Sequence, residues 1–129
     1  MDQTPLVSDD IEAGAEFIKR LNASWPVKAA CWLREEERFR YLYVALDGLT
    51  DTNTDEAYGE VLRITQEMKD HYIDPFRVKL IRLDHPVARA VLDIYGRFPG
   101  RRPPHADGSS FGGKAVVETY IYPPLAAKS

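Results

Sequence analysis

The sequence predicts an α+β domain. We expect a two-layer sandwich, in which three helices cover one face of a four-stranded mixed sheet, with the element order α-β-β-α-β-α-β. Two observations lead to this class. Segments with apolar residues at the helical period alternate with segments rich in β-branched and aromatic residues. The 129 residues, 44% of them hydrophobic and 29% charged, also have ordinary globular composition and suffice for one core. We therefore expect residues 1–129 to form a single domain, with 1–7 and 124–129 as loose tails.

Three segments carry the helical pattern. The first follows residues 8–10, whose side chains suit a helix N-terminus, and it ends before Trp25-Pro26. The second follows residues 53–56, which resemble a capping box, and it continues to about residue 71. A short third helix follows residues 84–86, where proline fits the first turn. Each segment has an apolar stripe, so each is predicted to pack on the sheet.

Four segments are predicted strands, and the first two form a hairpin. Residues 27–33 and 39–46 are rich in β-formers and separated by five residues, which favours an antiparallel pair. Residues 76–83 and 114–122 are the third and fourth strands. If Leu33 opposes Arg38, the aliphatic residues of both hairpin strands share one face. These residues are Val27, Ala29, Cys31, Leu33, Leu42, Val44 and Leu46.

The opposite face of the hairpin is the first candidate functional surface. With the tyrosines of the fourth strand on the same side, it collects Lys28, Trp32, Arg34, Phe39, Tyr41, Tyr43, Arg77, Lys79, Tyr120 and Tyr122. So much aromatic area favours contact with another molecule, and aromatic and arginine side chains are enriched in interface cores. The leading hypothesis is a non-enzymatic self-association or protein-interaction module, acting as a homodimer or with a protein partner. Two alternatives stay open: single-stranded nucleic acid stacks on this face, or the aromatic residues are ordinary core beneath a loop or helix.

The second candidate site is the long loop 97–113, which is rich in glycine, proline and arginine. Loops of this length are most often functional or disordered. Arg97, Arg101, Arg102, His105 and Lys114 could hold a phosphate or carboxylate there. The alternative hypothesis is therefore a small anionic ligand bound by this loop, in a binding protein or an enzyme. The loop matches neither the Walker pattern nor the dinucleotide-binding glycine pattern.

Charge and the remaining motifs argue against several classes. The formal charge of -3, from 17 basic and 20 acidic residues, disfavours nucleic-acid and membrane binding. His71, His85 and His105 are far apart in the sequence, so no metal site is predicted. No motif specifies a cofactor or a catalytic residue. The single cysteine, Cys31, lies among aliphatic residues and is predicted to be a buried thiol.

The N-terminal residues lack the basic and apolar regions of a signal peptide, and no apolar stretch approaches the length of a membrane span. We therefore expect a soluble, cytoplasmic protein.

Overall fold

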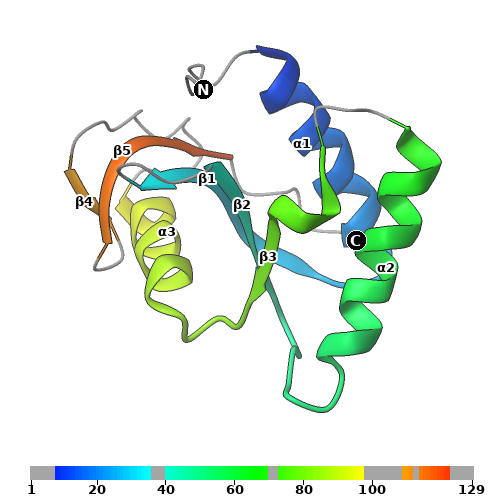
Figure 1. The fold of residues 1–129 in the computed structure, drawn as a ribbon. Helices are drawn as coiled ribbons and strands as arrows, with labels where there is room; N and C mark the ends of the chain where they lie inside the picture. Colours follow the sequence, from blue (N-terminus) through cyan, green and yellow to red (C-terminus); the bar gives the residue numbers. More distant parts are fainter. Residues whose placement is uncertain (1–7, 36–39, 70–72, 98–108, 112–113, 123–129) are drawn as a thin grey trace.

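The helices and strands follow one another along the chain in the predicted order. The computed structural model describes residues 8–35, 40–69, 73–97, 109–111 and 114–122 (Figure 1). The elements are α1 (Ser8–Asn22), β1 (Val27–Glu35), β2 (Arg40–Leu46), α2 (Thr54–Met68), the 3-10 turn η1 (Pro75–Arg77), β3 (Val78–Ile81), α3 (Pro86–Arg97), β4 (Ser109–Phe111) and β5 (Lys114–Ile121). The α+β class and the order of the three helices and four main strands are confirmed. Strand β4 is an addition within the predicted loop.

The strands form one open mixed sheet in the order β3-β2-β1-β5-β4. Strand β1 pairs antiparallel with β2 and with β5, and β5 pairs antiparallel with β4. Strands β2 and β3 are parallel, so the chain must cross from one end of the sheet to the other between them. Helix α2 makes this crossing and lies beside η1 and β3 (Figure 1).

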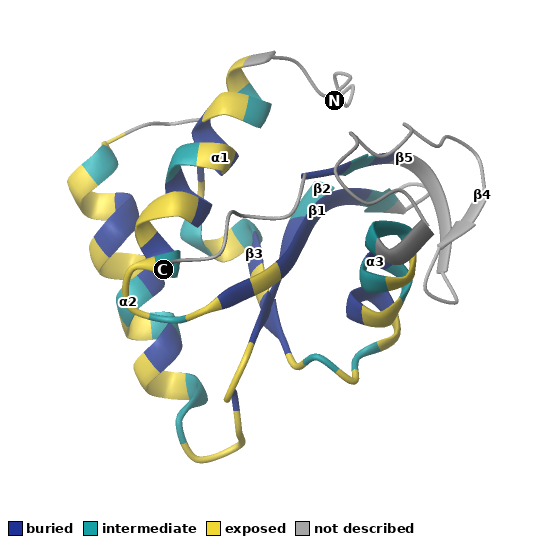
Figure 2. Cartoon of the chain, turned by 180° about the vertical axis from the view of Figure 1, so that it is seen from behind, coloured by how far each residue is buried: buried dark blue, intermediate teal, exposed yellow. Residues whose placement is uncertain are grey.

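The helices cover both faces of the sheet, so the prediction of a two-layer sandwich is wrong in this respect. Helices α1 and α2 pack on one face, where Phe17, Leu21 and Val61 join the core around Val44. Helix α3 packs on the other face through Val87 and other residues. Figure 2 shows the sheet between these two helical layers. The middle strands are therefore buried on both sides.

The register of the β1–β2 hairpin also differs from the prediction. Leu33 pairs with Tyr41 instead of Arg38, a displacement of three residues. Because side chains alternate along a strand, an odd displacement exchanges the faces of one strand relative to the other. Trp32 consequently shares the α1/α2 face with Leu42, whereas Tyr43 shares the α3 face with Cys31. The predicted separation into an aliphatic face and an aromatic face is wrong.

A buried hydrogen-bond network around Tyr122 joins the two layers. Its hydroxyl accepts a bond from Trp32 Nε1 at 2.8 Å and donates to the carbonyl oxygen of Ile11, in α1, at 2.7 Å. The Tyr95 hydroxyl, in α3, donates to the carbonyl oxygen of Tyr122 at 2.6 Å. Gly14 of α1 lies directly over the Tyr122 hydroxyl, where a Cβ would be 2.2 Å from the oxygen. This close approach requires glycine at position 14.

Candidate functional site

The aromatic residues of the first predicted surface lie on two different faces. Trp32 and Tyr122 are buried in the α1/α2 core, with Tyr120 packed against them and half-buried. Tyr43 is buried beneath α3, and Tyr41 packs at the edge of that core. These residues therefore do not form one open stacking or association face. Lys28 is exposed, Arg34 and Arg77 are half-buried, and Phe39 lies outside the described residues.

Three residues of the first predicted surface, Lys79, Tyr41 and Tyr43, still lie together on the α3 face. The ammonium group of Lys79 lies 4.3 Å from the ring centroid of Tyr41 and 5.5 Å from that of Tyr43. The His85 ring is 6.2 Å from the Tyr43 ring, and its Nδ1 accepts a hydrogen bond from the backbone N–H of Val87. These contacts fix the position of exposed Lys79 and of the turn before α3.

The anion-binding prediction falls largely outside the described residues. Arg101, Arg102 and His105 are in the segment 98–108, which the structure does not describe. Arg97 ends α3 and Lys114 begins β5, but their side chains are not described either. Anion binding by this loop stays a prediction.

The structure instead presents an apolar groove between α2 and the segment η1–β3. Among the described residues, the large apolar side chains that remain exposed are Phe76, with 85% of its surface accessible, and Leu62, with 45%. Both line a groove of about 310 Å³. The other lining residues are Tyr58, Val61, Pro75 and Val78. Two exposed apolar side chains at one groove make this flank the candidate contact surface among the described residues.

The Asp-Pro sequence before β3 places Phe76 outside the core. Asp74 accepts a hydrogen bond from the backbone N–H of Phe76 at 2.9 Å, and Pro75 occupies the first turn of η1. This turn replaces the start of the predicted strand 76–83, and β3 begins only at Val78. Sequence reasoning assigned Phe76 to the alternation of a strand and so missed its exposure. The Asp74-Pro75 pair, typical of a capped turn, was the available signal.

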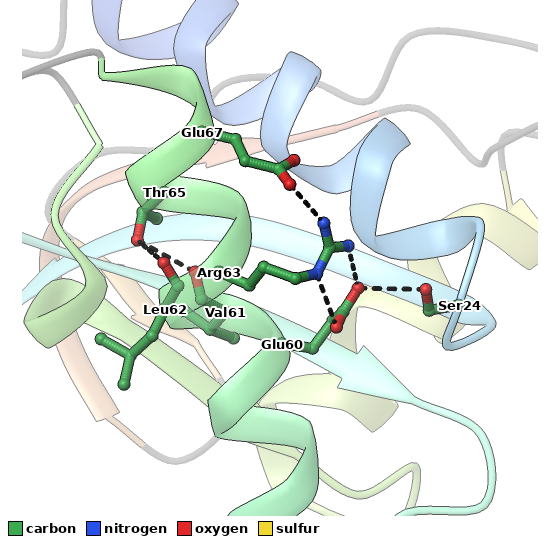
Figure 3. A network of polar contacts seen from close by, with 7 residues as sticks. All are labelled: Ser24, Glu60, Val61, Leu62, Arg63, Thr65 and Glu67. Carbon is green, nitrogen blue, oxygen red and sulfur yellow. Dashed lines mark hydrogen bonds and ion pairs between the residues drawn. The ribbon is translucent and has the colours of Figure 1, made fainter.

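The two flanks of α2 have different chemistry. On the side facing α1, Arg63 forms ion pairs with Glu60 and Glu67, and the Ser24 hydroxyl donates to Glu60 at 3.1 Å. The hydrogen bonds from Arg63 lower the pKa of Glu60. Leu62 projects away from this network, toward the groove (Figure 3). The charged side chains on the flank facing α1 are paired within the chain, whereas Leu62 on the other flank is exposed.

Two polar interactions beside the groove are made within the chain. The Tyr58 hydroxyl accepts a hydrogen bond from the backbone N–H of Leu80 at 3.0 Å, and the N–H of Val78 donates to the carbonyl oxygen of Pro75. Apart from the Tyr58 hydroxyl, the side chains that line the groove are hydrocarbon or aromatic. The groove thus offers apolar contact and little to orient a polar ligand.

Comparisons with known proteins leave the site to be interpreted from its geometry. No family model, curated protein or solved structure matches the chain. Within the described segments, no group of three or more histidine, cysteine or acidic residues could hold a metal ion. No helix in the same segments is long and apolar enough to cross a membrane. Cys31 is buried as predicted, and this burial raises the pKa of its thiol.

Proposed function

We propose that this domain is a non-enzymatic protein-interaction module whose contact surface is the groove between α2 and η1. The observation that carries the proposal is the 85% exposure of Phe76 beside Leu62 at that groove. Complete burial of an exposed side chain of this size contributes about 1.5–3 kcal/mol, so Phe76 would contribute nearly this amount and Leu62, which is 45% exposed, about half of it. An interface centred on them would have the aromatic and aliphatic anchor that protein partners commonly use.

The chemistry of the groove favours a protein over a small polar ligand. Small-molecule sites combine apolar walls with a few polar groups that orient the ligand. Here the hydroxyl of Tyr58 is the polar side-chain group of the lining, and it already binds the backbone of Leu80. Apolar side chains of another protein need no such groups. The predicted role in protein association is therefore kept, and its surface moves from the sheet face to the flank of α2.

Site-specific photocrosslinking in cells tests this proposal without assuming the identity of the partner. A photoreactive amino acid at Leu62 should give a discrete protein adduct, and the substitution Phe76→Ser should abolish it. The matched control carries the same amino acid at Glu56, which is also exposed on α2 but is not among the residues that line the groove. If the Leu62 position gives no adduct, or the same adducts as Glu56, the groove is not a contact surface.

A further inference from the structure

We infer that the protein seated on this groove is a second copy of the same chain, joined through antiparallel α2 helices about a twofold axis at Leu62. This inference rests on the proposed function and specifies the partner of the interaction module. Isologous dimers are the most common oligomers of soluble proteins, and they require a surface that is complementary to itself. The exposed flank of α2 has this property.

The charges along this flank are self-complementary. Asp55 and Leu62 are seven residues apart, which is close to two helical turns, so they follow one line along α2, and Lys69, seven residues further on, directly follows the last helical residue at the C-terminal end. All three are exposed. Asp55 lies in the first turn, and Lys69 is the C-cap residue. The line therefore has a negative charge at one end, an apolar residue in the middle and a positive charge at the other end.

This pattern selects one orientation of two copies. In an antiparallel pair centred on Leu62, Asp55 of each copy faces the other copy's lysine at position 69, because Leu62 is midway between them. The two Leu62 side chains then meet at the axis. In a parallel pair, Asp55 would face aspartate and Lys69 would face lysine. Like charges in an interface disfavour an arrangement, so the antiparallel pair is preferred.

The surroundings of Leu62 are consistent with close approach of a second helix. Gly59, one turn before Leu62, is exposed and has open space where a Cβ would be. Phe76 lines the same groove as Leu62, so a helix docked on Leu62 also covers the Phe76 ring. The network of Glu60, Arg63 and Glu67 lies on the flank facing α1 (Figure 3). Its charges consequently need not be desolvated when the dimer forms.

Charge-reversal variants of the full chain, studied by sedimentation equilibrium, test the arrangement. Asp55→Lys places a positive charge at both ends of the line along α2, and Lys69→Asp places a negative charge at both ends. Each variant alone should dimerise roughly 30-fold more weakly than the wild type, because two attractive pairs become repulsive. An equimolar mixture of the two variants should form heterodimers with nearly wild-type affinity, since both contacts are again attractive.

Glu56→Lys is the matched control for Asp55→Lys. It makes the same charge change in the same helical turn, with the same loss of favourable interaction with the helix N-terminus, but it lies off the proposed line. Its dimer affinity should stay within a fewfold of the wild type. Circular dichroism and thermal melting establish that each variant is folded. Aspartate at position 69 is compatible with the left-handed conformation of that residue, whose φ is 52°.

The outcomes separate this inference from the proposed function. If Phe76→Ser weakens a wild-type dimer and the charge reversals do not, the groove is the interface but the antiparallel arrangement is wrong. The arrangement is likewise overturned if the mixed variants fail to pair. A wild-type chain that stays monomeric at several hundred micromolar, yet crosslinks from Leu62 to a different protein, refutes the second copy and supports the interaction module. A monomeric chain without any crosslink contradicts both.

Discussion

Replacing Gly14 by alanine should destabilise the protein, although alanine is the better helix former. The new Cβ would lie 2.2 Å from the Tyr122 hydroxyl and 3.1 Å from Trp32 Nε1. The helix would gain about 1 kcal/mol from the substitution. Overpacking of a core costs about 1–3 kcal/mol. Displacement of the Tyr122 hydroxyl leaves the buried Trp32 N–H without its partner, at a further cost of about 1–3 kcal/mol. The expected net loss is about 1–5 kcal/mol.

Urea unfolding, followed by tryptophan fluorescence and circular dichroism, measures this loss. Gly59→Ala is the matched control, because its Cβ meets no atom within 4 Å, and it should raise the free energy of unfolding by about 0.5–1 kcal/mol. In a Tyr122→Phe background, Gly14→Ala should cost less, since the contact at 2.2 Å is gone and only the contacts at 3.1 Å to Trp32 Nε1 and to the ring carbon Cζ of residue 122 remain. A Gly14→Ala variant as stable as the wild type would refute the close approach of α1 to Tyr122.

Two further predictions concern pH and a turn. Burial raises the pKa of the Cys31 thiol, so the native state keeps a proton that the unfolded chain loses above its ordinary pKa of about 8.5. The free energy of unfolding should therefore fall above that pH by up to about 1.4 kcal/mol per pH unit, until the native thiol ionises. Urea titrations between pH 8 and 10 check this, and Cys31→Ala should remove that part of the slope; an unchanged slope contradicts the assignment. Gly48→Ala should cost about 1–2 kcal/mol in urea unfolding, because the φ of Gly48 is 84° and no neighbouring atom is in the way; a neutral result would argue against this backbone conformation.

The helices could be predicted from sequence because their apolar residues follow one period. In α2, Ala57 and Val61, which are four residues apart, are both buried, as expected for an apolar stripe at the helical period. The hairpin register could not be predicted, because its strands are covered by helices on both faces. Trp32 and Leu33 are adjacent, and both are buried. In such strands, alternation does not distinguish the core side from the solvent side, so it cannot select between registers.

The groove escaped sequence analysis for a different reason. Leu62 is adjacent to the buried residue Val61, and Phe76 was assigned to the predicted strand 76–83. Whether either side chain is exposed depends on how α2 and η1 meet, and this is a tertiary contact between segments without a local pattern. The Arg-rich loop shows the converse: its composition indicates a candidate site, but the described residues do not include its core.

The hydrogen bond between Tyr58 and Leu80 limits the pairing of foreign strands with the edge of the sheet. Strand β3 is the outer strand at one side of the sheet, and an outer strand with unpaired amides is a template for adding foreign strands and for fibril growth. The N–H groups of Val78 and Leu80 that do not bond to β2 are taken by Pro75 and by the Tyr58 hydroxyl. Backbone recognition, which is indifferent to sequence, is thereby obstructed along this side. A partner that binds at the β3 edge must therefore be recognised by the shape and charge of its side chains.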